Sequence, residues 1–209
     1  PAWTSNRGNN QTIVIQPDLE KTYVPTNSTR TFFEGELFLG GQLALTHYLA
    51  AQLGIVGAAT NSFGISGIIW DDADPRFDNY VYSYHVSHTH LALKAKFLGT
   101  AIYDLHPYLS GSIGLGLNQA RRFQSTPLIE EAVPTPNFGN QTHTAAVYAV
   151  GLGLQKPIGE HWHMGLGYEF ESWGRTELAN GPDQLFGRAA FVPNLYVNEV
   201  MWSLTYVWN

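Results

Sequence analysis

The sequence predicts an all-β protein, a closed antiparallel up-and-down transmembrane β-barrel of about eight strands. Apolar and polar residues alternate with period two in many segments, as they do in strands with two different faces. Charged residues make up 13% of the chain, about half of the ~25% usual in soluble domains. No segment approaches the ~18 consecutive apolar residues that a membrane helix needs. In a barrel only alternate residues face lipid, so weak hydropathy in each segment is expected.

Eight segments are predicted to be strands, and together they make the whole chain, 1–209, a single domain. The segment 11–24 is the weakest, because Pro17 interrupts it and proline is tolerated mainly at edges or bulges. The predicted strands are 11–24, 31–45, 48–60, 80–98, 106–123, 142–157, 161–176 and 194–208.

The strands differ in how clearly they alternate. In 31–45 and 48–60, every second position is leucine or another apolar or small residue, on either side of a tight turn near Thr46. In 80–98, aromatic residues near its start share the face that later carries Lys94 and Lys96, which indicates a bulge or a part standing above the lipid. In 106–123, leucine and isoleucine oppose serine and glycine, and the last three strands repeat this contrast.

The connections alternate in length, which predicts the topology. The links 46–47, 99–105 and 158–160 are short, whereas 61–79, 124–141 and 177–193 are long. Outer-membrane barrels have short periplasmic turns and long extracellular loops. We therefore expect both termini on the periplasmic side. No secretory leader is visible at Pro1, so an exported protein would begin here in its mature form.

The polar face of the strands indicates that the apolar face points outward into lipid. Most of the polar face is glycine, alanine and serine, which suit the crowded interior of a narrow barrel better than a water-exposed surface. Aromatic residues also collect near the strand ends, as in the girdles of membrane barrels. Tyr48, Phe97, Trp162, Tyr206 and Trp208 are assigned to one rim, and Tyr23 and Phe33 to the other.

Charged residues on the polar face are predicted to form an ion-pair network that plugs the lumen. Charges removed from bulk water must be paired. The network is expected to comprise Glu34, Glu36, Lys94, Lys96, Glu169, Glu171, Arg175 and Glu199, with His88 and His90 beside them. The alternative is a gate or narrow pore whose selectivity follows these charges.

Two patterns are compatible with metal binding, although no metal site and no cofactor are predicted. His88 and His90 share one strand face, and His163 or a glutamate could complete a site there. The extracellular loop residues Asp71, Asp72, Asp74 and Asp78 could bind Ca²⁺. Their spacing is not that of an EF-hand, and Asp and Pro are ordinary turn formers. We interpret the histidines as polar lining and the aspartates as turn residues.

The chain resembles the outer-membrane-protein-A and opacity-type family of eight-stranded surface barrels. The resemblance lies in the strand pattern of 105–123, with Pro107-Tyr108, and in the Gly-x-Gly-Tyr-Glu-Phe strand at 165–170. Many family members end on an aromatic residue, whereas here Asn209 follows Trp208. The resemblance implies an integral protein of the Gram-negative outer membrane, surrounded by lipid and lipopolysaccharide. It does not fix a function, because one fold carries many.

We interpret the chain as a monomeric structural or adhesin-like surface protein whose loops contact host or surface macromolecules. The alternative is a porin-like narrow channel for ions or small solutes. A remote alternative is a lipid-modifying enzyme, since His85 and Ser87 resemble the His and Ser of outer-membrane lipid A deacylases. No glutamate can be placed beside them, so no enzyme is predicted. The net charge of −6 argues against nucleic acid, and the absence of cysteine excludes disulfides and thiolate sites.

Overall fold

The computed structural model of the chain is all-β, with fourteen strands among the residues that it describes. It describes all residues except 6–7, 18, 101–102, 183, 185 and 208–209. The strands are β1 (Ala2–Ser5), β2 (Gln11–Gln16), β3 (Leu19–Pro25), β4 (Thr29–Phe32), β5 (Glu34–Thr46), β6 (Leu49–Thr60), β7 (Phe63–Asp71), β8 (Asp78–Gly99), β9 (His106–Pro127), β10 (Gln141–Pro157), β11 (Trp162–Ser172), β12 (Thr176–Glu177), β13 (Phe191–Val192) and β14 (Tyr196–Tyr206). Within the described residues, no helix is long and apolar enough to cross a membrane.

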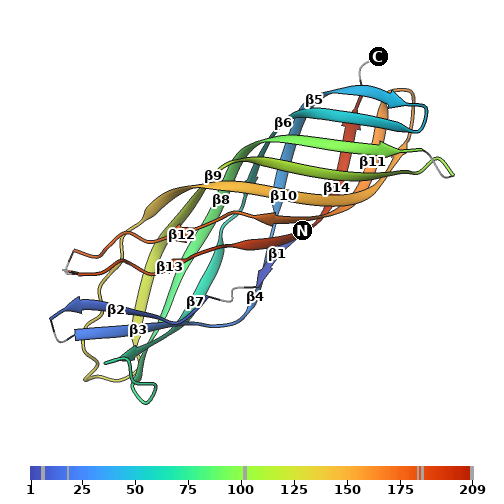
Figure 1. Cartoon of the computed structure of the whole chain (residues 1–209). Helices are drawn as coiled ribbons and strands as arrows, with labels where there is room; N and C mark the ends of the chain where they lie inside the picture. The colour runs from blue at the N-terminus through green and yellow to red at the C-terminus, as the bar shows by residue number, and fades with distance from the viewer. Residues whose placement is uncertain (6–7, 18, 101–102, 183, 185, 208–209) are drawn as a thin grey trace.

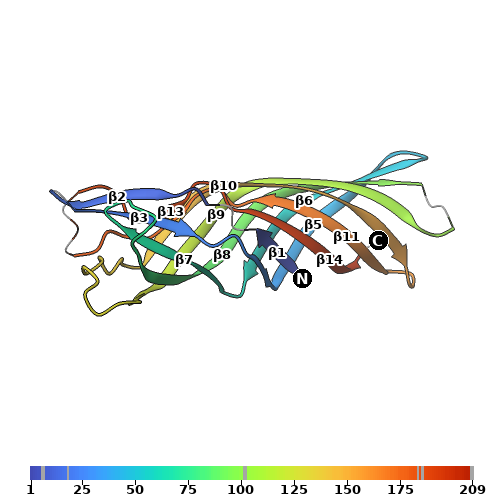
Figure 2. The same ribbon diagram turned by 90° about the horizontal axis from the view of Figure 1, so that it is seen from below.

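Twelve of the strands form one antiparallel sheet, and β12 pairs only with β13. The hydrogen-bonded order runs β2-β3-β7-β8-β9-β10-β11-β14-β1-β4, and a branch leads from β8 through β6 to β5. β8 and β9, at 22 residues each, are the longest of these strands and pair with each other. Figures 1 and 2 show that the sheet curls along an elongated molecule, with β2 and β3 near one end and the turn between β5 and β6 near the other.

The prediction of a closed eight-stranded barrel is wrong, because the sheet is open and has more strands. β5 pairs with β6 and β14 pairs with β11, but no ladder among the described strands joins β5 to β14. β1 covers the edge of β14 only from Val197 to Glu199. We call the space between β5 and the part of β14 that follows Val200 the seam.

The N-terminal segment explains why the sheet does not close. The predicted strand 11–24 does not span the molecule, because it folds back on itself as the β2–β3 hairpin around Pro17. This hairpin extends the sheet beyond β7 instead of running along β14. β1, which does lie beside β14, is only four residues long. The predicted loop 61–79 also contains a strand, β7, which pairs with both β3 and β8.

The other predicted strands correspond to observed ones. The segment 31–45 spans β4 and β5, and 48–60, 80–98, 106–123, 142–157, 161–176 and 194–208 overlap β6, β8, β9, β10, β11 and β14. The predicted irregularity in the fourth segment is a register shift between Ser83 and His85, opposite Arg122 of β9, whose φ is 57°. The aromatic residues before the shift and the lysines after it share one buried face of β8.

The polarity of the two sheet faces reverses along the molecule. We call the face of β8 that carries Tyr82 and Lys94 the inner face, and the opposite one the outer face. The loop half, which contains β2, β3, β7, β12, β13 and the adjoining ends of β8 and β9, has an apolar inner face. Its core includes Tyr23, Phe32, Phe63, Ile65, Ile69, Tyr80, Tyr82, Tyr84, Phe123, Phe138, Trp173 and Leu195.

The turn half consists of β5, β6, β10, β11, β14 and the remaining lengths of β8 and β9. Its inner face is polar, unlike the apolar inner face of the loop half. On the inner face His88, His90, Lys94, Ser110 and Glu169 are buried. The outer face is apolar and exposed at Leu37, Leu39, Leu53, Ile55, Leu91, Leu93, Leu109, Ile113, Leu115, Val150, Leu152, Leu166 and Trp202. Leu115, for example, is 64% exposed, whereas Ser110 on the same strand is 4% exposed.

Most of the aromatic residues assigned to rims are exposed. Tyr48, Phe97, Trp162 and Tyr206 lie near the turns of the turn half with at least 44% of each residue exposed, and Phe33 is 70% exposed. The assignment of Tyr23 is wrong, because its ring is buried against Tyr82 and Phe138 in the core of the loop half. Trp208 lies outside the described residues.

Candidate functional site

The inner face of the turn half holds a buried ion-pair centre around Lys94. The Lys94 ammonium lies 2.7 Å from a carboxylate oxygen of Glu36 on β5 and 2.9 Å from one of Glu169 on β11. The Lys94 and Glu169 side chains are almost fully buried, whereas the Glu36 side chain is 23% exposed. One cation on β8 thus links two carboxylates from strands that are not its neighbours in the sheet.

The remaining carboxylates on this face outnumber the cations near them. Glu199 on β14 is paired in register with Glu169, so two buried glutamates face each other across neighbouring strands. Glu171 is 1% exposed. Lys96 is directed to Tyr108, with its ammonium 4.6 Å from the ring centroid. The inner face therefore carries more negative than positive charge.

Arg175 is not part of this centre. Its guanidinium lies 2.5 Å from Glu177 and 4.2 Å from the centroid of the Phe191 ring, beside β12 and β13. The prediction that Arg175 joins the inner network is therefore wrong. The reason is that β11 ends at Ser172, so Arg175 no longer follows the alternation of that strand.

A chain of hydrogen bonds leads from Asn118 through His88 to His90. The Asn118 amide nitrogen donates to the carbonyl oxygens of Trp173 and Arg175, so its Oδ1 is the acceptor for His88 Nδ1 at 2.7 Å. His88 Nε2 lies 3.2 Å from His90 Nδ1. The His88 ring also stacks on Trp173 with a centroid distance of 4.1 Å. These contacts fix the orientation of both histidine rings.

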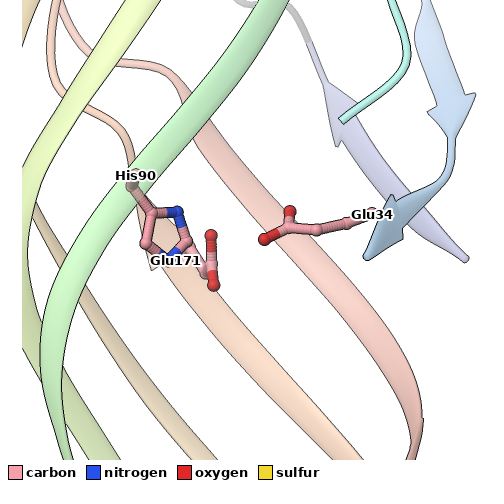
Figure 3. Close-up of side chains that lie close together, drawn as sticks. All are labelled: Glu34, His90 and Glu171. Atoms are coloured by element: carbon pink, nitrogen blue, oxygen red, sulfur yellow. The ribbon is translucent and has the colours of Figure 1, made fainter. Parts of the chain in front are cut away.

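His90 lies beside two glutamates. A ring nitrogen of His90 and one carboxylate oxygen each of Glu34 and Glu171 lie within 4.8 Å of one another. Figure 3 shows the three side chains converging from β8, β5 and β11. The Trp173 indole N–H donates to Glu171 Oε2 at 2.5 Å. Glu34 Oε2 is buried and accepts no hydrogen bond among the described residues.

His163 does not complete this cluster. It lies near the opposite end of the turn half, where Gln155 Nε2 is 3.1 Å from its Nδ1. His163 and His106 line a pocket there with the β5–β6 turn. The alternative of a site shared by His88, His90 and His163 is thus not supported, whereas the alternative of a glutamate beside His90 has the required proximity.

The aspartates assigned to the long loop do not converge. Asp71 ends β7, where it is buried, ion-paired with Lys21, and hydrogen-bonded by Asn79. Asp74 pairs with Arg76 at the surface, and the hydrogen bonds from Arg76 lower the pKa of Asp74 to about 2. Asp72 lies in the turn with a φ of 50°, and Asp78 begins β8. In the described part of the chain these aspartates form no cluster with metal-ligand spacing.

His85 and Ser87 lie on the outer face of β8, as the alternation predicts. His85 is exposed and Ser87 is half-buried. Within the described residues, no hydrogen bond joins these two side chains, and no glutamate accompanies them. The arrangement therefore supplies no oriented base for a serine nucleophile.

Small residues on the inner face leave room for the buried polar side chains. A Cβ on Gly116 would lie 2.5 Å from the His88 ring. A Cβ on Gly151 would lie 2.7 Å from Ser110 Oγ and 2.9 Å from Glu169 Oε2. The glycines therefore determine how closely the histidines and carboxylates approach the sheet.

Three residues that make the polar contacts described above were not predicted from the sequence to do so. Asn118 lies on the polar face of 106–123, but nothing in the local sequence connects it with His88, which lies thirty residues earlier in the chain. Trp173 lies inside the predicted strand 161–176, but β11 ends at Ser172, so the alternation of that strand does not place its side chain. Lys21 pairs with Asp71 only because the β2–β3 hairpin adds to β7. Complementary charge on Lys21 and Asp71 was the one available signal.

No family model, curated protein or solved structure matches this chain in the comparisons with known proteins.

Proposed function

We propose that this protein is an integral protein of a bacterial outer membrane, whose turn half lies in lipid and whose loop half stands outside the cell. In this proposal it acts as a structural or surface-interaction protein through the loop half. The observation that carries the proposal is the reversal of polarity along single continuous strands.

β8 displays this reversal most directly. In the loop half its inner face presents Tyr80, Tyr82 and Tyr84 to a buried apolar core, as in a water-soluble protein. In the turn half the same face buries Lys94, while Leu91 and Leu93 on the outer face are 64% and 61% exposed. Monomeric soluble proteins rarely expose contiguous apolar surface beyond a few hundred Å². An outward apolar band over a polar interior is the arrangement of β-proteins that span the outer membrane.

The open strand edge at the seam limits how the protein can be placed in lipid. Hydrocarbon cannot satisfy the backbone N–H and C=O groups of a free strand edge. We therefore expect the seam to contact water, lipid headgroups or another peptide segment rather than lipid tails. Gly40, Gln42 and Ala44, on the side of β5 that continues the inner face, are exposed, which is consistent with access from the seam.

The packing of the interior favours a structural role over a channel. The Lys94 side chain crosses from β8 to carboxylates on β5 and β11, so the interior is occupied at this level. A conducting pore would need a continuous water-filled path past this pair.

Membrane extraction tests the location. Cells that express the chain are lysed, and their membranes are washed with alkaline carbonate and then extracted with detergent. The proposal predicts that the protein stays with the outer-membrane fraction and enters solution only with detergent. Recovery of folded protein in the buffer fraction without detergent would overturn it.

Planar-bilayer recordings separate the structural role from a channel. Purified protein should give no steady conductance. Steady conductance that changes in the Lys94→Ala variant would instead establish an ion pathway through the interior and would contradict the structural role.

A further inference from the structure

We propose that Glu34, His90 and Glu171 form a binding site for one divalent transition-metal ion of the Zn²⁺ type. This inference does not depend on the proposed membrane location. It follows from the hydrogen bonds around the three side chains and from the charge balance of the inner face.

The hydrogen bonds from Asn118 determine which nitrogen of His90 is free to bind a metal. Asn118 Oδ1 can only accept, so His88 Nδ1 carries the proton and donates to it. In a neutral ring His88 Nε2 is then an acceptor, and His90 Nδ1–H donates to it. His90 Nε2 is left with an unprotonated lone pair, the form in which imidazole binds metals.

His90 Nε2 is deprived of a hydrogen-bond donor. His90 is 7% exposed, and no donor to Nε2 is found among the described residues. The carboxylates of Glu34 and Glu171, which when ionised can only accept hydrogen bonds, lie beside a ring nitrogen of His90. With Nε2 turned toward these carboxylates, three acceptors would converge, and a cation at their centre would satisfy all three.

The two carboxylates differ in how they are held. Glu171 receives the indole N–H of Trp173 on Oε2, which orients its carboxylate. Hydrogen bonds of this kind to the ligands of a metal fix their direction and tune their affinity. Glu34 begins β5, and its Oε2 is buried without a hydrogen-bond partner in the described structure. The three ligand atoms lie within 4.8 Å of one another, and side-chain rotation would bring them closer to reach the ~2.0–2.2 Å metal–ligand distances of Zn²⁺.

The charge of the inner face favours a cation at this point. Its glutamates are Glu34, Glu36, Glu169, Glu171 and Glu199, whereas its lysines are Lys94 and Lys96. Lys94 is already bonded to Glu36 and Glu169, so Glu34 and Glu171 have no lysine of their own. Buried carboxylates need a counter-charge or a proton.

The ligand set indicates the class of metal. One imidazole nitrogen with two carboxylate oxygens suits Zn²⁺ and neighbouring first-row ions, whereas Ca²⁺ and Mg²⁺ take oxygen ligands. Because β5, β8 and β11 are not adjacent in the sheet, the ion would join three separate parts of the curl. We therefore assign it a structural role, holding the start of β5 against the opposite wall beside the seam.

Zn²⁺ titration of the purified full chain tests the site. Isothermal titration calorimetry and metal analysis after dialysis should give one tightly bound Zn²⁺ per chain, and Zn²⁺ should raise the unfolding temperature. Mg²⁺ should neither bind tightly nor displace Zn²⁺. Absence of stoichiometric Zn²⁺ from the folded wild-type chain would overturn the proposal.

Three ligand variants and one matched control separate coordination from general charge attraction. His90→Gln, Glu34→Gln and Glu171→Gln should each lower Zn²⁺ affinity at least tenfold. Glu199→Gln removes a carboxylate from the same face but not a ligand, so it should retain wild-type affinity within a few-fold. Equal loss in Glu199→Gln would show that Zn²⁺ responds only to net charge and would contradict the site.

Spectroscopy distinguishes the loss of a metal ligand from the misfolding of a variant. Co²⁺ bound to the wild-type chain should give visible absorption bands of a four- or five-coordinate ion, and Zn²⁺ should abolish them. Circular dichroism establishes that each variant retains its strands. A folded His90→Gln chain that gives unchanged Co²⁺ bands would overturn the assignment of His90 as a ligand.

Discussion

At the scale of single residues, the inner face of the turn half is organised by Lys94. It is the cation for Glu36 and Glu169, and both it and Glu169 are buried. Buried ion pairs do not by themselves add much stability, because desolvation offsets their attraction. Removing one partner, however, leaves the other charge buried and uncompensated.

Replacing Lys94 with methionine should therefore destabilise the fold strongly. We expect a loss of about 3–5 kcal/mol in the free energy of unfolding, which is typical when one partner of a buried pair is removed. Urea unfolding in detergent measures it. Arg76→Met, which breaks a surface pair with Asp74, is the control and should leave the midpoint unchanged. Equal midpoints for both variants would show that Lys94 is not required.

Replacing glycine with alanine should change the stability in opposite directions on the two faces of the sheet. At Gly151 a Cβ would press on Ser110 and Glu169, so Gly151→Ala should cost about 1–3 kcal/mol by overpacking. At Gly41 an added Cβ meets nothing within 4 Å, so Gly41→Ala should stabilise the strand by about 0.5–1 kcal/mol. Denaturant unfolding of the two variants checks both signs. A stabilising Gly151→Ala would contradict the packing described for the ion-pair centre.

At the scale of the strand, the alternation of side chains carried most of the information that the sequence offered. In β9 it correctly separated exposed Leu109, Ile113 and Leu115 from buried Ser110. Every second side chain of a strand points to the same face, so this result needs no knowledge of the neighbouring strands.

The alternation failed where the chain reversed and where a strand lay inside a predicted loop. The segment 11–24 has strand-forming residues on both sides of Pro17, but its fold as a hairpin depends on β7, a distant partner. β7 itself was predicted to be a loop, because Asp72 and Pro75 after it are turn formers. Likewise, the contacts of Asn118 and Trp173 with His88 join residues distant in sequence, so no local pattern could indicate them.

An arginine on the outer face of β9 should destabilise the protein far more than an arginine on a surface that faces water. If Leu115 lies near the middle of the bilayer, Leu115→Arg should cost about 2–4 kcal/mol in lipid. Folding titrations in lipid vesicles measure it. Val81→Arg, also on the outer face but in the loop half, should fold in vesicles as efficiently as the wild type. Efficient folding of Leu115→Arg would contradict lipid contact at this face.

At the scale of the whole molecule, the open seam distinguishes this sheet from a closed cylinder. Among the strands that the structure describes, β5 has a neighbour on the β6 side alone, whereas β9 is paired on both edges. Backbone groups without a strand partner exchange their hydrogens readily with solvent.

Hydrogen exchange should therefore differ between β5 and β9. In detergent micelles we expect rapid exchange at alternate residues of β5, whose N–H groups face the seam, and slow exchange throughout the middle of β9. Nuclear magnetic resonance resolves the individual amides. Uniform protection along β5, equal to that of β9, would mean that another segment covers its free edge.

The proposed membrane location requires lipid to begin partway along the strands, and depth-dependent quenching measures this position directly. The natural chain has no cysteine, so single cysteines at Val81, His85, Leu91, Leu93 and Phe97 can carry a fluorescent probe on the outer face of β8. We expect aqueous iodide to quench probes at Val81 and His85, and brominated lipid tails to quench those at Leu91 and Leu93. Iodide quenching of all five probes, with no effect of brominated lipid, would contradict the account.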